Sequence, residues 1–288
     1  MPLTLKNFNK VTPPLCFTAN TAGSKVRINT FWTPTSVTLE TSTDNVNWSS
    51  YTFGTNITLS NIWDKLYFRN TSESDTWFST STSDFYQFTI SWSIAWSGDV
   101  TMLVNKNWTT TISNYCFYRL FYWCGSLTTA PLLNATTLAT QCYDSMFYSC
   151  TSLTTVPDFP VATLGRYCCN LMFYYCNSLE IAPALPATTL VDWCYQQMFA
   201  GCSKLISIPK LPATALQWWC YNSMFSWCSK IKLSTSKTGE YQTEYRIPTT
   251  WTWTTVSSAL TNMFYSTWGS FTWTPSINTT YYTSNTLV

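Results

Sequence analysis

The chain has 288 residues and a formal net charge of +2; 10% of its residues are charged, 45% hydrophobic and 18% aromatic. This length fits one or two domains, and so little charge, without a basic stripe, argues against nucleic-acid binding. No apolar run approaches the roughly eighteen residues that a membrane-spanning helix needs.

Residues 1–90 contain few cysteines, much Thr and Ser, and short stretches in which apolar and polar residues alternate. Ser36–Glu40 and Asn56–Leu59 are two such stretches, and Asp44-Asn45 reads as a turn between strands. Because alternation with a period of two is typical of half-buried strands, we predict a small all-β sandwich over residues 1–90. Residues 91–115 are expected to be a linker and the N-terminal cap of the region that follows.

The N-terminal segment Met1–Asn7 has no apolar core of the kind that secretory signal peptides carry. A bacterial surface protein needs an export signal, whereas a virion protein assembles in the cytoplasm. This favours a phage origin, and a surface protein trimmed of its signal stays as the alternative.

A repeat of 26 residues fills residues 116–233. The first cysteines of its five units stand 26 residues apart, and a second cysteine follows each of them after eight residues. Leu or Met, then Phe, and further on Leu or Ile and Pro keep the same phase. The ten cysteines of this lattice are Cys116, Cys124, Cys142, Cys150, Cys168, Cys176, Cys194, Cys202, Cys220 and Cys228. Since a fixed period is the signature of stacked identical units, we predict a solenoid of five units.

One unit predicts a helix followed by an extended segment. Leu138, Cys142, Met146 and Cys150 are spaced by four residues, which indicates an apolar stripe along a helix. Leu153–Phe159 is short and contains a proline, so it is expected to be a strand or an extended turn. The predicted fold class is therefore an α/β solenoid of short strand plus helix units, preceded by the small all-β domain.

The repeated run Cys-Tyr-x-x-Met-Phe-x-x-Cys-x-Ser-Leu-x-x-x-Pro-x-Leu-Pro-Ala-Thr resembles the BspA-like leucine-rich repeats. That family occurs in surface proteins of gut and oral bacteria and in some of their phages. The resemblance is specific over residues 112–233 and looser at Tyr67–Ser72 and Ser276–Tyr282. It implies a leucine-rich-repeat fold and a role in adhesion, and it carries over no catalytic residue.

The cysteines are predicted to be packing residues. Two cysteines eight residues apart on a helix lie about 12 Å apart, and equivalent residues of packed helices lie about 8–10 Å apart. A disulfide needs about 4.4–6.8 Å between Cα atoms. Zinc fits poorly too, since the repeat cysteines lack C-x-x-C spacing and the chain has no histidine. We therefore expect no metal and no other cofactor.

Residues 234–288 are predicted to form a C-terminal cap and tail. Ala259–Thr267 copies the repeated pattern with both cysteines replaced, as expected of a terminal unit whose outer face meets water.

Variable aromatic residues on an invariant frame are the candidate ligand contacts. Positions just before the two cysteines of each unit vary among Tyr, Trp, Ser, Gly and Gln, which is typical of a binding surface on a rigid scaffold. The candidate residues are Trp123, Tyr148, Tyr175, Trp193, Trp219 and Trp227. The alternative is that these rings fill grooves between stacked units.

A second hypothesis concerns the tryptophans themselves. The family resemblance implies glycine at positions such as 123 and 227, and Gly201 shares that phase. Four more tryptophans lie in turn-like contexts where glycine is easier to place: Trp251, Trp253, Trp268 and Trp273. We hypothesise that many of these tryptophans are recoded UGA codons, in which case the aromatic surface shrinks.

The function predicted from the sequence is non-enzymatic. The chain lacks the common general base histidine, its thirteen carboxylates do not cluster, and no phosphate loop is present. The first hypothesis is a phage virion protein, such as a fibre, decoration or host-attachment component. It would be located in the virion, form a homo-oligomer, and bind other virion proteins or a host-surface glycan or protein. The alternative is an extracellular adhesin on a bacterial cell surface. A third hypothesis, a carbohydrate-active enzyme, requires two carboxylates about 5–10 Å apart in a cleft.

Overall fold

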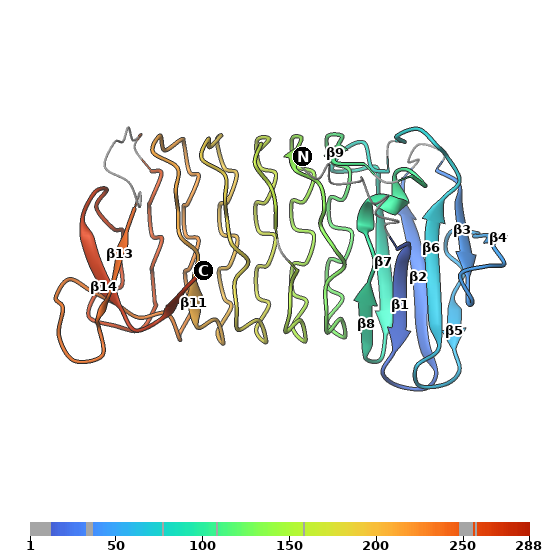
Figure 1. Cartoon of the computed structure of the whole chain (residues 1–288), viewed down its shortest axis with the longest axis horizontal. Helices are drawn as coiled ribbons and strands as arrows, with labels where there is room; N and C mark the ends of the chain where they lie inside the picture. The colour runs from blue at the N-terminus through green and yellow to red at the C-terminus, as the bar shows by residue number, and fades with distance from the viewer. Residues whose placement is uncertain are drawn as a thin grey trace, which may run out of the picture.

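The computed structural model describes residues 13–32, 37–76, 78–107, 109–157, 159–247, 256 and 258–288. The molecule is elongated: β-strands form one end, regularly spaced turns of chain form the middle, and a smaller group of strands forms the other end (Figure 1). Met1–Asn7, Ser36, Trp251 and Trp253, which figured in the sequence predictions, lie outside the described residues.

Two antiparallel sheets form the N-terminal end. The first has the order β4-β3-β6-β1-β8 and consists of β1 (Leu15–Ala19), β3 (Leu39–Ser42), β4 (Ser49–Ser50), β6 (Lys65–Asn70) and β8 (Ile94–Ser97). The second has the order β5-β2-β7 and consists of β2 (Ser24–Phe31), β5 (Ile57–Leu59) and β7 (Phe85–Ser91). Buried rings join the sheets, with the centroid of Phe17 on β1 5.1 Å from that of Phe88 on β7. This β-rich end is compatible with the predicted sandwich, and β8 extends it past residue 90.

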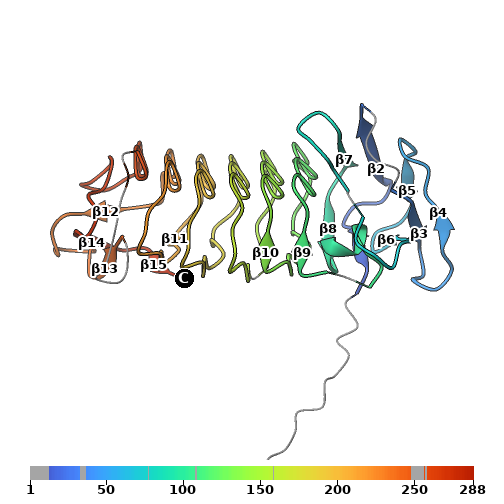
Figure 2. The ribbon, with the colours of Figure 1, turned by 90° about the horizontal axis from the view of Figure 1, so that it is seen from above.

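The N-terminal sheets hydrogen-bond directly to the first repeat unit. The amide of Phe88 on β7 donates to the carbonyl of Leu120 at 2.7 Å, and the amide of Ile94 on β8 donates to that of Ser126 at 3.3 Å. A short 3-10 helix, η1 (Val100–Leu103), follows β8, and the amide of Val100 donates to the carbonyl of Leu132 at 3.2 Å. The middle of the molecule therefore continues the N-terminal sheets along the long axis (Figure 2).

Each repeat unit contains a turn segment, the name we give to residues 115–124, 141–150, 167–176, 193–202, 219–228 and 258–267. Amides within a turn segment alternate between two kinds of partner. The amides of Tyr143 and Ser145 donate at 2.8 Å to carbonyls of the next unit, at Cys168 and Asn170. The next amide along the chain, that of Met146, donates to the carbonyl of Tyr143 at 3.2 Å, three residues back, which closes a tight turn. Each segment is thus a chain of overlapping turns, hydrogen-bonded at every second residue to the segment that follows.

The predicted α/β solenoid is wrong, because the described part of the chain contains no α-helix. Every fourth residue of a turn segment has a left-handed backbone, with φ of 54° at Gln141, 55° at Ser145 and 57° at Ser149. A right-handed helix does not tolerate such residues. The spacing of four that predicted a helix from Leu138 to Cys150 arises from the period of the turns, which returns the same side chain direction every four residues.

Columns of identical side chains fill the interior of the stacked units. Stacked phenylalanine rings run through every unit with centroids 5.3–5.7 Å apart: Phe88, Phe121, Phe147, Phe173, Phe199, Phe225 and Phe264. All twelve cysteines are free and buried. The second cysteine of each unit donates its thiol to a phenylalanine carbonyl of the preceding layer, as Cys124 does to Phe88 on β7 at 3.2 Å and Cys150 to Phe121 at 3.1 Å.

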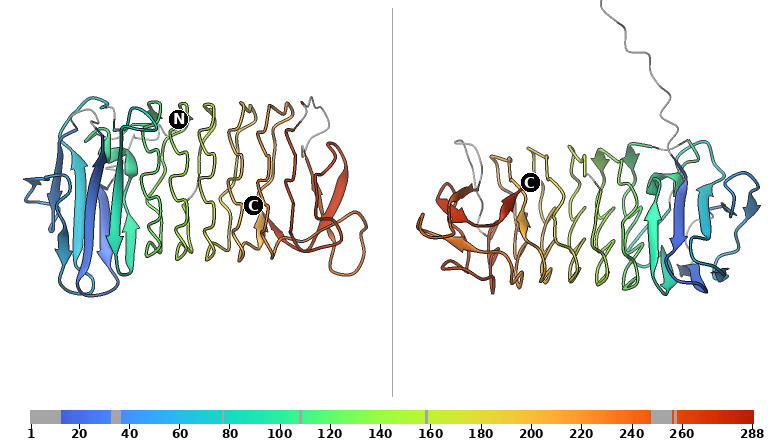
Figure 3. Two further views of the ribbon diagram at one scale, coloured as in Figure 1. Left: turned by 180° about the vertical axis from the view of Figure 1, so that it is seen from behind. Right: turned by 60° about the horizontal axis from the view of Figure 1, so that its bottom comes forward.

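Short strands line the opposite edge of the stack. β9 (Thr111–Ile112) pairs in parallel with β10 (Thr137–Leu138), and β11 (Ser207–Ile208) pairs in parallel with β15 (Thr286–Leu287) from the chain's C-terminal end. β12 (Leu233–Ser234), β14 (Thr280–Thr283) and β13 (Thr243–Arg246) form a three-stranded antiparallel sheet. The C-terminal residues therefore return to an earlier unit, as seen on both sides of the molecule (Figure 3).

Candidate binding surface

Three tyrosines form a row near the end of the first three turn segments. Tyr122, Tyr148 and Tyr174 are each partly exposed and stand 26 residues apart. The rings of Tyr122 and Tyr148 stack with centroids 4.7 Å apart, and those of Tyr148 and Tyr174 stack at 4.8 Å. We call these three residues the tyrosine ridge. It stops at Ala200, the buried residue that holds the same position in the fourth unit.

The stacking decides what the tyrosine ridge offers to a partner. Since the middle ring is covered on both faces by its neighbours, a partner meets ring edges and hydroxyl groups. Burial raises the pKa of Tyr148, and burial together with the neighbouring Tyr175 raises the pKa of Tyr174 to about 12. Both phenols therefore keep their protons at neutral pH and can donate as well as accept hydrogen bonds.

Arg119 lies beside the tyrosine ridge. Its guanidinium carbon is 4.9 Å from the centroid of Tyr122 and 5.0 Å from that of Tyr118. A cation over a ring face is a favourable contact, so Arg119 fixes the first tyrosine of the row and adds one positive charge beside it.

The six residues predicted as ligand contacts fall into two groups. Trp123, Tyr148, Tyr175 and Trp227 lie at the end of their turn segments, and all but Tyr148 are exposed. Trp193 and Trp219 lie at the start of theirs and are partly buried. The structure therefore does not bring the six together on a single line.

Two of these predicted contacts are held by intramolecular packing. Trp193 stacks on Tyr167 with centroids 4.8 Å apart, and the guanidinium carbon of Arg166 lies 4.4 Å from its ring centroid. Tyr175 leans over Gly201, where an added Cβ would meet the tyrosine ring at 2.4 Å. Tyr122, Tyr174 and Arg119 were missed from the sequence, although the tyrosines stand in register with Tyr148 and could have been found by following that column.

Three described carboxylates, those of Asp44, Asp99 and Asp144, accept hydrogen bonds from residues close to them in the chain. Asp44 accepts hydrogen bonds from the amides of Val46 and Asn47 at 2.8 Å, which hold its pKa well below the usual range. Asp99 accepts from Thr101 at 2.8 Å and caps η1. Burial raises the pKa of Asp144, to which Ser145 donates at 2.7 Å.

The cysteine thiols are buried and unreactive. Burial raises the pKa of the Cys124 and Cys202 thiols to about 12, so they stay protonated and are poor nucleophiles. Within the described ranges, no group of three or more Cys, Asp or Glu residues is placed to hold a metal ion.

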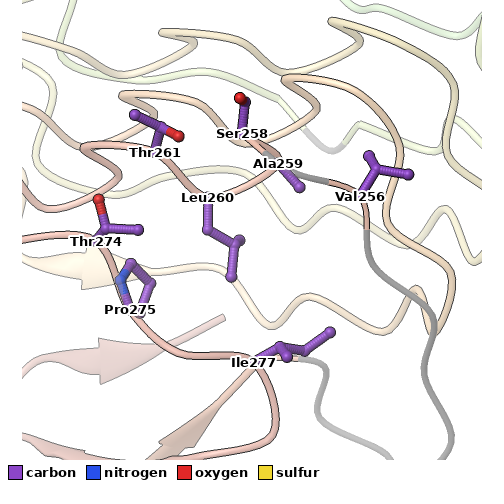
Figure 4. Close-up of a pocket in the computed structure, with 8 residues that line it drawn as sticks. All are labelled: Val256, Ser258, Ala259, Leu260, Thr261, Thr274, Pro275 and Ile277. Carbon is purple, nitrogen blue, oxygen red and sulfur yellow. The ribbon is translucent and has the colours of Figure 1, made fainter.

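A small pocket lies where the last turn segment meets the chain that follows it. Its lining consists of Val256, Ser258, Ala259, Leu260, Thr261, Thr274, Pro275 and Ile277 (Figure 4). Apolar side chains such as Leu260, Pro275 and Ile277 alternate with hydroxyls, among them Thr274, whose Oγ1 accepts from the amide of Asn262 at 2.8 Å. The lining residues that are described carry no charge, so the pocket has no ionisable group with which to bind a charged ligand or to catalyse a reaction.

Comparisons with models of known protein families, with curated proteins and with solved structures found no match. In the part of the chain that the structure describes, no helix has the length and apolar character needed to cross a bilayer.

Proposed function

We propose that the protein is a non-enzymatic binding protein, a host-attachment component of a phage virion, and that the tyrosine ridge is its contact surface. The single observation that carries the proposal is the regular row of Tyr122, Tyr148 and Tyr174, whose rings stack 4.7–4.8 Å apart. The rigid stack beneath fixes the spacing of the hydroxyls, so little conformational entropy is lost when a partner binds.

The chemistry of the ridge favours a partner rich in hydroxyl or carbonyl groups. The phenols of Tyr148 and Tyr174 are protonated donors and acceptors, and among the described residues the charged side chain in contact with the ridge is Arg119. A host-surface glycan matches this pattern, and an extended protein segment is the second possibility. The resemblance to BspA-like repeats supports an adhesive role, and it supports a bacterial surface adhesin equally well.

Binding to a glycan array and to host-cell envelopes tests the proposal. Replacing Tyr122, Tyr148 and Tyr174 together by alanine should weaken binding more than about tenfold, because central aromatic residues dominate the energy of interfaces. The matched control is Tyr241→Ala, which removes a partly exposed tyrosine outside the repeats and should leave binding unchanged.

Two results contradict the proposal: unaltered binding by the triple variant, or no binding of the unmodified protein to any glycan or envelope preparation. Phage structural genes beside this gene support a virion component, whereas an export signal encoded upstream supports the adhesin.

A further inference from the structure

Tryptophan is over-represented in this chain and glycine is scarce. The chain has 16 tryptophans and 8 glycines. Glycine ordinarily makes up about 7% of a protein, several times the usual share of tryptophan. In this chain the usual order of the two frequencies is reversed, and the backbone shows at which positions tryptophan stands where glycine is expected.

Seven of the described tryptophans have a left-handed backbone with φ between 56° and 72°: Trp32, Trp63, Trp92, Trp123, Trp193, Trp219 and Trp227. None of the described phenylalanines does, and among the described tyrosines Tyr115, Tyr167 and Tyr175 do. A side chain at positive φ crowds its own backbone, and for bulky residues this conformation is a genuine outlier, whereas glycine adopts it without strain.

Packing does not offset this strain at several of the seven. The exposed fraction is 84% at Trp32, 73% at Trp63, 63% at Trp92 and 68% at Trp123. A large apolar side chain that stays exposed to water contributes almost no hydrophobic free energy to the folded state. At these four positions the indole contributes little to stabilising the left-handed backbone conformation.

One column of the repeat gives an internal comparison. Trp123, Gly201 and Trp227 occupy the same position in three units, with φ of 64°, 77° and 59°. Their amides also donate to the equivalent carbonyl of the next unit, at 2.8, 2.7 and 2.8 Å. The tryptophans and the glycine thus perform the same backbone role, which Ser149 and Tyr175 hold in the other two units with φ of 57° and 56°.

We infer that glycine is the native residue at these seven positions: the gene carries UGA there, and the organism that makes the protein reads UGA as glycine. Trp48 serves as the contrast. Its φ is not left-handed, and the guanidinium carbon of Arg69 lies 4.0 Å from its ring centroid, so a tryptophan is used there and its codon should be UGG. The inference does not depend on the proposed function, because the tyrosine ridge contains none of the seven.

Peptide mass spectrometry of the protein from its natural source, read beside the gene sequence, is the direct test. We expect glycine in the peptides at the seven positions, each lighter by the difference between an indolylmethyl group and hydrogen, and tryptophan at position 48. Tryptophan in the peptides at the seven positions overturns the inference whatever the codon, and so do UGG codons there.

Stability of the recombinant protein gives a second, independent readout. At position 123, Trp→Gly should raise the midpoint of thermal unfolding above that of Trp→Ala by about 2–4 °C, since only the alanine variant keeps a Cβ at positive φ. At position 48 the order should reverse, because glycine there only adds freedom to the unfolded chain. Equal midpoints for the two substitutions at position 123 count against the inference.

Discussion

Left-handed residues at every fourth position shape the turn segments. They include Gln141, Ser145 and Ser149 in one unit and Ser258, Asn262 and Ser266 in the last. Each reverses the chain direction locally: its own amide donates to the neighbouring unit, as Ser145 does to Asn170, and the next amide donates three residues back within the segment, as Met146 does to Tyr143. The apolar residues between them then return to the interior, where the phenylalanine and cysteine columns form.

Also at the residue scale, the buried thiols make the free energy of unfolding depend on pH in the alkaline range. Burial raises the pKa of Cys124, Cys202 and Cys220 from about 9 to about 12. Between these values the unfolded chain loses thiol protons that the folded chain retains. The free energy of unfolding should therefore fall as pH rises above about 9, by roughly 1.4 kcal/mol per pH unit for each such thiol.

Urea unfolding at a series of pH values measures this effect. Buried tyrosines such as Tyr195 and Tyr221 add a fall of the same sign at higher pH, because burial raises their pKa too. Cys202→Ser, which keeps a donor for the Phe173 carbonyl but does not titrate in this range, should make the slope shallower. A free energy of unfolding that stays constant from about pH 8 to 10 would contradict the account.

At the scale of the elements, alanine substitutions at two glycines test how closely the backbones of neighbouring units approach each other. A Cβ added at Gly165 would lie 2.3 Å from the carbonyl carbon of Ala139, whereas the nearest atom to one at Gly125 would be the Thr151 hydroxyl, at 3.3 Å. Gly165→Ala should lower the free energy of unfolding by about 1–3 kcal/mol, since backbone cannot move aside. Gly125→Ala is the matched control and should cost under about 1 kcal/mol. Equal costs in chemical denaturation would show that the units are not packed this closely.

The elements also show what the sequence could and could not predict. The spacing of 26 residues is the separation of side chains that stack in neighbouring units, such as Phe147 and Phe173, and alternation in β2 and β6 matches strands. The helix prediction failed because Cys142, Met146 and Cys150 repeat every four residues in overlapping turns as well as along a helix. Left-handed residues distinguish overlapping turns from a helix, but Gln and Ser, which hold positions 141 and 145, are not residue types that predict a left-handed backbone. The tyrosine ridge was predictable in part, since Tyr148 was chosen without its two neighbours in the column.

At the scale of the whole molecule, the stack is close to one-dimensional. Turn segments bond to the segment before and the segment after, so stability is expected to be a sum over units and their contacts. The C-terminal end departs from this pattern, because β15 pairs with β11 and Asn285 donates to the carbonyls of Ile206 and Lys230 at 3.2 and 2.9 Å.

Deletion of one complete unit tests this architecture. Removing residues 168–193 joins Tyr167 to Cys194 and keeps every column in register, so the shortened protein should fold and melt cooperatively. Removing only 168–180 shifts the columns and should leave an unfolded or aggregated chain. Circular dichroism and size-exclusion chromatography distinguish the outcomes; loss of folding in both variants would contradict the prediction.

The alternating amides of the turn segments give this edge of the molecule an electrical polarity. Along it, the amides of Gln141, Tyr167 and Trp193 all donate toward the C-terminal neighbour, at 2.9, 3.3 and 2.9 Å. In an ordinary strand such bonds point to both sides and their dipoles cancel. Here the peptide dipoles add, as they do in a helix, with the positive pole toward the C-terminal end. This edge thus has a defined electrostatic direction along the stack, whereas on the opposite edge amides such as those of Thr154 and Ile206 donate to the preceding unit.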